Sequence, residues 1–573
     1  MLRLSRSLLG AVALAFVLVV PAHANAPDVV RSVDPFVGTS SGAPDFGTGG
    51  GAGATFPGAV FPFGMVQFSP DTEPGADNFA GGYSYRDRLL RGFSLTHFSG
   101  AGCAGFGDVP ILPTTAAVKS SPAVAGSGDV NPRYLARFDH RDEQASPGSY
   151  GVILDPRSSH PISVALTATT RTGDARLVFP ARRRVSVLVN AGGSSLANYA
   201  AGVRVDPGAR EIFGSVQSGG FCFQPTKYRV YFVARFDRRF AASGTWDGEA
   251  VTPGGRSADA TNPRAFSLKG VPGGPAVLPG NPSTGVQVGA YASFDTVTTR
   301  TVVVRIGISF TSLAQARRNL ARESLGRPFD RLRAAARQQW RAELGKVSVS
   351  GGSPRLRSLF YTALYHALIE PSTLSDTDGS YPGMDGRVHR AGEAVQYTDI
   401  SGWDVYRTQV PLLAMLEPQR AADLVTSLVR DARQSGCLPR WPYADQQTNV
   451  MTGDPSDPII AAIYAFGARG FDAQAALGWM VAGATRPCHT QNGDYTEREA
   501  LADYLRLGYI PQEQDTNAVG HTVGSRQLAW GAAATTARGR GCRQRRFRLR
   551  AALGSAGNRR AFCAAGRELA AAV

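Results

Sequence analysis

Residues 397–413 (YTDISGWDVYRTQVPLL) hold the side chains of this sequence that are best suited to chemistry. They place two carboxylates, Asp399 and Asp404, beside Trp403 and ahead of an apolar segment typical of a helix. A rigid ring next to a carboxylate suits a sugar site, because the ring stacks on the sugar while the carboxylate holds its hydroxyls. The alternative is that Trp403 and Tyr406 anchor a core and that the acids occupy a first helical turn, where the helix dipole favours them.

Cysteine and histidine spacing predicts no metal centre. Cys103, Cys222, Cys437 and Cys488 lie far apart in the sequence, and no histidine pair has the spacing of zinc ligands. These cysteines are compatible both with disulfides and with buried thiols, and the sequence does not pair them. We therefore assign no metal ligand.

The net charge of +16 is concentrated at one end of the chain. Residues 531–573 hold ten arginines and one acid, which leaves +7 for the preceding 530 residues. A nearly balanced body lacks the clustered basic surface of a nucleic-acid binder, so we expect no nucleic-acid partner.

Residues 1–24 have the features of a signal peptide. Arg3 and Arg6 precede an apolar run, residues 8–20, that is too short to cross a bilayer, and residues 22–24 (AHA) form a small-x-small cleavage site. No later segment approaches the ~20 apolar residues of a membrane helix. We expect an exported protein, periplasmic or secreted, without a membrane span.

The period of the apolar residues changes near residue 311. Residues 27–310 contain β-branched and aromatic runs separated by turns, which predicts a sandwich of antiparallel sheets. Residues 311–350 have helical periodicity broken at Gly326 and Pro328, which predicts a linker of two helices. The clearest strand-like runs are 185–189, 228–236 and 301–310.

Helical patterns dominate residues 351–523. Loops rich in Asp, Gly, Pro and aromatic residues separate them, and paired helices of this kind predict a toroid of α-hairpins, of which six helices make half. The predicted helices are 356–369, 408–416, 419–434, 456–469, 472–484 and 497–507.

The sequence changes character at residue 524. Residues 524–573 are runs of Ala and Arg almost without acids, and they lack caps and sustained apolar periodicity. Such a sequence is typical of a GC-rich gene read out of frame, and a genuine basic tail is the alternative. We favour the out-of-frame reading, because a half-built helical domain has no physical reason to stop there.

Several blocks of this sequence occur in a familiar order. Over residues 30–523 they resemble glycoside hydrolase family 92, the exo-acting α-mannosidases. The blocks are 33–39 (VDPFVGT), 56–65 (FPGAVFPFGM), 82–85 (GYSY), 92–103 (GFSLTHFSGAGC), 218–222 (SGGFC), 360–365 (FYTALY), 397–407 (YTDISGWDVYR) and 451–455 (MTGDP).

The resemblance implies an N-terminal antiparallel β-sandwich, a helical linker and an (α/α)6 toroid, which is incomplete in this chain. It places a mannoside pocket between the two domains. It also implies inverting, calcium-assisted cleavage of terminal α-mannose from mannose-containing glycans. We expect a monomer.

Inversion needs one carboxylic acid to protonate the leaving oxygen and one carboxylate to activate water, about 6.5–9.5 Å apart. In the family the acid lies in a Glu-Gly-Asn motif and the base in a Gly-Asn-Asp-Asp motif. Neither Glu-Gly-Asn nor Asn-Asp-Asp occurs in this sequence. We therefore assign no catalytic residues, expect the main calcium ligands to be missing as well, and predict that the chain as written is inactive.

Residues that match the family's blocks form the candidate substrate site. Trp403 and Asp404 match the family's Trp-Asp pair, which implies a stacking platform and a hydroxyl-binding carboxylate for the terminal mannose. Arg407 is a candidate to orient Asp404 through a bidentate pair, with a purely structural ion pair as the alternative.

Three further residues are weaker candidates for this substrate site. His97 and Cys103 match a block that faces the domain interface, although a lone His and a lone Cys are more often structural. Trp441 is a candidate for an outer subsite, and core packing is its alternative role.

Two other functions remain open at this point. One is a non-catalytic carbohydrate-binding remnant. The other is a disaccharide phosphorylase on a similar architecture, which would need a basic phosphate pocket, and the sequence before residue 524 shows no basic cluster for one.

Overall fold

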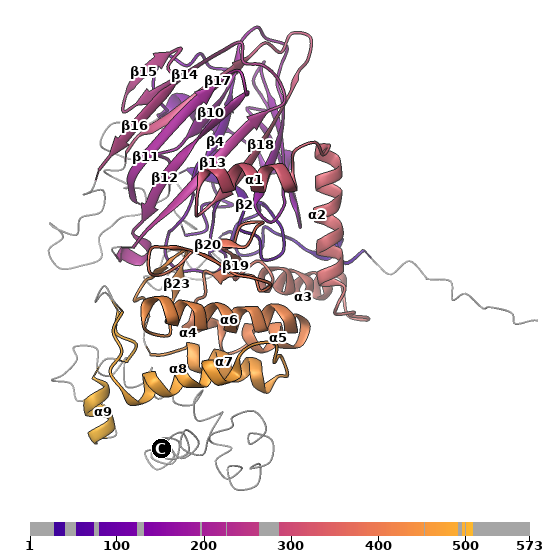
Figure 1. The fold of residues 1–573 in the computed structure, drawn as a ribbon. Coiled ribbons are helices and arrows are strands. Elements are labelled where there is room, and N and C mark those ends of the chain that lie inside the picture. The colour runs from indigo at the N-terminus through magenta and orange to yellow at the C-terminus, as the bar shows by residue number, and fades with distance from the viewer. Residues whose placement is uncertain are drawn as a thin grey trace, which may run out of the picture.

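The computed structural model describes residues 28–40, 53–73, 80–122, 131–194, 197–224, 226–262, 286–451, 453–490, 495–498 and 500–507. In this part of the chain the strands form one half of the molecule and the later helices form the other (Figure 1). The predicted signal peptide at 1–24 and tail at 524–573 lie outside the described residues.

The strand half is a sandwich of two antiparallel sheets, each with nine strands among the described residues. The first sheet contains β1 (Ala59–Val60), β2 (Gln67–Glu73), β3 (Leu89–Ser94), β4 (Ile111–Thr114), β5 (Ala136–Arg137), β10 (Val185–Asn190), β14 (Ala242–Asp247), β15 (Ala250–Pro253) and β17 (Val288–Phe294). The second contains β6 (Glu143–Ser146), β7 (Ser149–Leu154), β8 (Ile162–Ala168), β9 (Thr172–Val178), β11 (Ala197–Asp206), β12 (Glu211–Gly219), β13 (Lys227–Phe236), β16 (Ser257–Thr261) and β18 (Thr301–Ser309).

Alternation along the strands directs side chains into this sandwich. In β7, Tyr150, Val152 and Leu154 are buried while the residues between them are partly exposed. Because successive side chains of a strand point to opposite faces, this pattern fixes which face of β7 packs inward.

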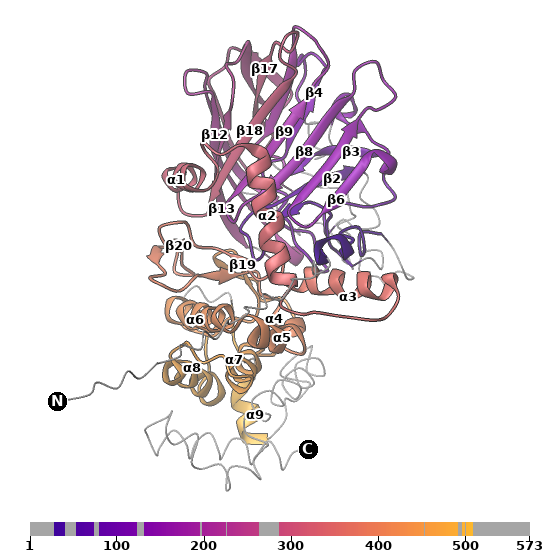
Figure 2. The same ribbon diagram turned by 90° about the vertical axis from the view of Figure 1, so that its right-hand side faces the viewer.

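The helices follow the last strand of the sandwich. Helix α2 runs along the sandwich to the start of α3, where the helical half begins (Figure 2). The helices are α1 (Leu313–Glu323), α2 (Phe329–Leu344), α3 (Pro354–Ala367), α4 (Gly402–Val405), α5 (Gln409–Leu416), α6 (Pro418–Ser435), α7 (Ser456–Ala465), α8 (Ala473–Thr485) and α9 (Leu501–Leu507). Short strands lie between them: β19 (Ser372–Thr373), β20 (Ser380–Pro382), β21 (Val388–Arg390), β22 (Tyr397–Thr398), β23 (Pro442–Tyr443) and β24 (Gln446–Gln447).

Local sequence sets the helix ends. Ser312, Ser353 and Asp472 cap α1, α3 and α8, and each side chain accepts a hydrogen bond from a backbone N–H of the first turn. Helix α6 ends at Gly436, whose φ of 98° is a left-handed conformation that glycine adopts without steric cost.

The two halves share their hydrophobic cores. Phe56, Val60 and Phe63 come from the β1 region but are buried among side chains of α2 to α8. Trp441 and Tyr443, which follow α6, are buried among sandwich residues. The halves therefore interlock and do not meet at a flat surface.

The predicted fold class is confirmed: an antiparallel β-sandwich precedes a helical domain. The predicted runs at 185–189, 228–236 and 301–310 are β10, β13 and β18, and the two linker helices are α1 and α2. The short hairpins among the later helices were not predicted, because runs of two or three residues carry no measurable periodicity. No helix among the described residues has the length and hydropathy needed to span a membrane.

Four cysteines form two disulfides. The sequence had been compatible both with disulfides and with buried thiols. Cys103 bonds to Cys222, and Cys437 bonds to Cys488. The first joins residues 119 apart and the second joins residues 51 apart. Closing a longer loop removes more entropy from the unfolded chain.

We expect the double variant Cys103→Ser/Cys222→Ser to lower the free energy of unfolding by about 2–4 kcal/mol. Chemical denaturation of the oxidised chain measures the loss. Cys437→Ser/Cys488→Ser is the matched variant and should lose less, because its loop is shorter. Equal stability of the first variant and the wild-type chain would contradict the pairing.

Candidate functional site

A cavity of about 320 Å³ lies where the sandwich meets the helices. This volume is within the ~300–1,000 Å³ range of small-molecule sites. Its described lining comes from four places: residues 53–55 and 99–101 of the sandwich half, 366–371 at the end of α3, residues between 399 and 413 around α4 and α5, and Leu424 with Trp441.

Two carboxyl groups, Glu370 and Asp399, line this cavity. The Ser99 N–H donates to Glu370 Oε1 at 2.7 Å, and the Ala444 N–H donates to Asp399 Oδ1 at 3.2 Å. Burial raises the pKa of Asp399 to about 7. Burial, together with the nearby charge of Asp399, raises the pKa of Glu370 well above its usual range. Burial thus favours the protonated form of Glu370, and that form can donate a hydrogen bond to a ligand.

Asp399 is held in a sparsely populated backbone conformation. Its φ of 60° lies in the left-handed region, which non-glycine residues seldom occupy. Such strain persists only where the surrounding structure fixes it, and it is commonest at ligand sites. The conformation follows β22, where Tyr397 and Thr398 pair with Thr373 and Ser372 of β19.

The predicted residue Asp404 also lines the cavity, in the short helix α4. It is exposed, and its Oδ2 accepts a hydrogen bond from Ser401 Oγ at 2.5 Å. The serine at the helix start fixes this side chain, and the carboxylate keeps oxygen lone pairs that sugar hydroxyls can use.

The neighbouring Trp403 and Arg407 contact each other. The Arg407 guanidinium lies 4.8 Å from the centre of the Trp403 ring and 4.5 Å from that of Tyr406, and it also donates to the Trp403 carbonyl oxygen. Neither Trp403 nor Arg407 belongs to the described lining of the cavity. A stacking platform at Trp403 and a bidentate pair between Arg407 and Asp404 remain predictions.

The side chains of His97 and Cys103 are engaged with other parts of the protein. His97 is buried, donates from Nδ1 to the Gln67 carbonyl oxygen at 2.8 Å, and has Nε2 3.1 Å from Asp71 Oδ1. The sulfur of Cys103 is bonded to Cys222. Neither residue belongs to the described lining of the cavity, so their role as substrate contacts stays a prediction beside the structural role that was its alternative.

Trp441 lines the cavity and is also part of the shared core. Its ring lies 4.8 Å from the Phe221 ring and 5.7 Å from the Phe98 ring. With only 3% of its surface exposed, most of the indole packs against protein, and one part faces the cavity. Core packing is the role that the structure shows for this residue, and its role in an outer subsite stays a prediction.

Glu370 and His366 line the cavity but were not predicted from the sequence. Burial lowers the pKa of His366 to about 4, so its ring is neutral, and its buried Nε2 has no hydrogen-bond partner among the described residues. The available signal was weak: a single carboxyl follows the apolar end of α3 and precedes Pro371. The Glu370 carboxyl becomes part of a site only because the 99–101 loop approaches it in the folded chain.

The cavity does not present a calcium cage in the described residues. Calcium takes about six to eight oxygen ligands around one point. Among the described residues, only one group of three possible metal ligands (His, Cys, Asp or Glu) has its ligand atoms within 4.8 Å of one another. This group is Cys437, Cys488 and Glu497, and its two sulfurs form a disulfide. Calcium binding by this chain therefore stays an expectation from the family resemblance.

Two family models match the chain. The model of the glycosyl hydrolase family 92 N-terminal domain matches residues 32–309, and that of the glycosyl hydrolase family 92 catalytic domain matches residues 315–552. The second match extends past residue 523, where we had placed the end of the toroid sequence. Comparison with curated proteins gave no match.

Solved structures share the fold. A family 92 α-mannosidase from Bacteroides thetaiotaomicron, in complex with mannoimidazole, is 24% identical with a TM-score of 0.75, over 94% of this chain and 63% of that chain. A family 92 inverting mannosidase from Bacteroides thetaiotaomicron VPI-5482 is 23% identical with a TM-score of 0.75, over 95% of this chain and 65% of that chain. The family 92 glycosyl hydrolase ccman5 is 25% identical with a TM-score of 0.70, over 95% and 63%. This chain therefore spans less than two thirds of the length of these three.

We expect Asp399→Asn to flatten the pH dependence of folding stability. Burial raises the pKa of Asp399 from 3.8 to about 7, so between these values the folded state binds more protons than the unfolded state. The stability contributed by this group therefore falls as pH rises through that window, by up to about 1.4 kcal/mol per pH unit. Asparagine does not titrate, keeps an acceptor for the Ala444 N–H and tolerates the left-handed backbone.

Denaturant unfolding at several pH values between about 4 and 7 measures this slope. Asp206→Asn is the control, because Asp206 is an exposed carboxyl whose Oδ1 also accepts a backbone N–H. The interpretation is wrong if Asp399→Asn and Asp206→Asn have the same slope.

Proposed function

Because the chain belongs to glycosyl hydrolase family 92, we propose that it is an exported protein of the α-mannosidase type that binds the terminal α-mannose of glycans. The cavity at the junction of sandwich and helices is the binding site in this proposal. The observation that carries it is the position of Asp404, which the family resemblance selected and which lines that cavity together with Glu370 and Asp399.

Each polar group of the cavity has a complementary task toward a sugar. The Asp404 carboxylate accepts hydrogen bonds from ring hydroxyls, while Glu370 donates one in the protonated form that its burial favours. The neutral His366 ring offers its Nε2, which has no hydrogen-bond partner among the described residues. Apolar lining from Ile400 and Leu413 excludes water, which strengthens these hydrogen bonds.

Catalysis in the proposed class is inverting and calcium-assisted. It requires a general acid and a general base, and this sequence has neither the Glu-Gly-Asn motif nor the Asn-Asp-Asp motif. Calcium would supply a Lewis acid that helps to flatten the sugar ring. We therefore propose that this polypeptide binds mannosides without turning them over, which is the carbohydrate-binding alternative.

We expect the purified chain to release no aryl group from an aryl α-mannoside, with or without added calcium. The chromogenic assay runs beside an unrelated active α-mannosidase as a positive control. Turnover that a calcium chelator abolishes would overturn the proposed inactivity while supporting the substrate class.

We expect Asp404→Asn to weaken the binding of methyl α-mannoside by about tenfold or more, since a hydrogen bond to a charged group contributes about 1.5–3 kcal/mol. Isothermal titration calorimetry measures the affinity. Asp330→Asn is the matched control, because Asp330 is an exposed carboxylate on α2, away from the cavity. Unchanged binding by Asp404→Asn, or equal loss in both variants, contradicts the assignment.

A further inference from the structure

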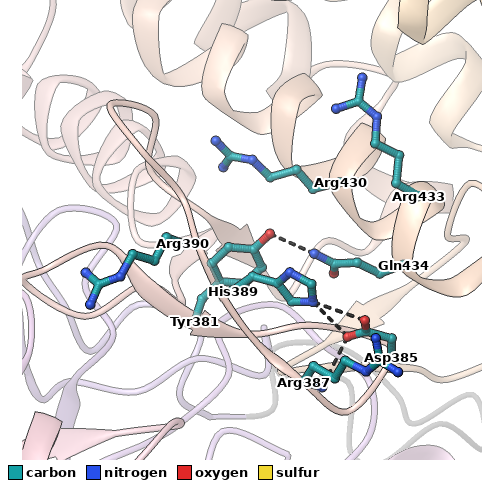
Figure 3. Close-up of a pocket in the computed structure, with 8 residues that line it drawn as sticks. All are labelled: Tyr381, Asp385, Arg387, His389, Arg390, Arg430, Arg433 and Gln434. Atoms are coloured by element: carbon teal, nitrogen blue, oxygen red, sulfur yellow. Dashed lines mark hydrogen bonds and ion pairs between the residues drawn. The ribbon is translucent and has the colours of Figure 1, made fainter.

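A second cavity, of about 540 Å³, lies between the hairpin of β20 and β21 and the C-terminal half of α6. It shares no lining residue with the mannoside cavity. Figure 3 shows Arg430 and Arg433 extending from the helix on one side, with Arg387 and Arg390 on the hairpin. Four arginine side chains thus line one cavity, which we call the arginine pocket.

The arginine pocket has an excess of positive charge. The only carboxylate in its described lining is Asp385, and its oxygens contact His389 Nε2 at 2.9 and 3.1 Å. Arg390 is 3.3 Å from Asp378 Oδ2, which lies outside the lining. Arg430 donates to the Gln396 side-chain oxygen at 3.2 Å.

The other two arginines keep their donors available. Within the described part of the chain, the guanidinium groups of Arg387 and Arg433 make no hydrogen bond or ion pair, and both side chains are exposed. They come from the two opposite walls, so each can reach a ligand in the cavity. The helix and the hairpin are held together within the pocket, because Gln434 Nε2 donates to the buried Tyr381 hydroxyl at 2.7 Å.

We propose that the arginine pocket binds a tetrahedral oxyanion, that is, a phosphate or sulfate group. A guanidinium presents several N–H donors in a planar fork and binds such oxygens in pairs. Donors from two opposite walls suit a group whose oxygens point in several directions, whereas a carboxylate offers two oxygens in one plane. The volume also accommodates the molecule to which an esterified group would be attached.

The arginine pocket was not visible in the sequence before residue 524. Arg387 and Arg390 lie 40 or more residues from Arg430 and Arg433, so no basic run appears in the sequence. The spacing of three residues on α6 places Arg430 and Arg433 on one helix face, and the hairpin then brings its own pair opposite.

Calorimetric titration of the full chain with inorganic phosphate, inorganic sulfate and a hexose 6-phosphate tests the proposal at moderate ionic strength. We expect saturable binding at one site. Arg387→Gln and Arg433→Gln should each weaken it by about tenfold, equivalent to about 1.4 kcal/mol. Tighter binding of the hexose phosphate would identify an ester as the ligand, and equal affinity would identify the free ion.

Arg331→Gln is the matched control, since Arg331 is exposed on α2 outside the pocket. Circular dichroism confirms that the three variants are folded, and the unphosphorylated hexose should not bind at this site. An equal loss in Arg331→Gln would mean general electrostatic attraction and would overturn the proposal. The absence of saturable binding by wild-type chain would also overturn it. The assay does not depend on mannoside binding, so the two proposals fail separately.

Discussion

Phe63 belongs to the strand half by sequence and to the helical half by packing, and the candidate site depends on this interlock. Its N–H donates to the Leu368 carbonyl oxygen at 3.1 Å, and its own carbonyl accepts from the Thr373 N–H at 3.0 Å. The two residues that Phe63 bonds, Leu368 and Thr373, precede and follow Glu370 in the sequence. Because the hydrogen bonds and the buried ring fix the end of α3 against the sandwich, Ser99 can reach the Glu370 carboxyl.

Burial of carboxyl groups at this junction has an energetic cost. Burial reduces the hydration of the Glu370 and Asp399 carboxyl groups, so the protonated forms are favoured and the pKa of each group rises. A fold optimised only for stability would avoid such a pair. Perturbed pKa values beside a cavity are therefore a physical indication of function, independent of any family resemblance.

Helix α6 contributes to two cavities of opposite character. Leu424 lines the acidic cavity at the junction of the two halves, while Arg430 and Arg433 line the arginine pocket about two turns further along the helix. Its inward face is largely buried, which makes it a rigid common wall. Rigid walls help both sites, because a ligand then binds preorganised donors and acceptors.

The amino-acid sequence was sufficient to predict a strand-rich half followed by a helical half, because periods of two and 3.6 residues are local properties of the chain. It also identified Asp404, because a carboxylate beside an aromatic ring is visible as a short motif. It did not predict β19 to β24 or α4, which are too short to show a period. Tertiary structure alone decided the rest: the pairing of Cys103 with Cys222, the raised pKa of Glu370, the burial of His97 and the meeting of four arginines. Each of these depends on which segments, far apart in the sequence, pack together. Neither periodicity nor motif spacing tells which segments do so.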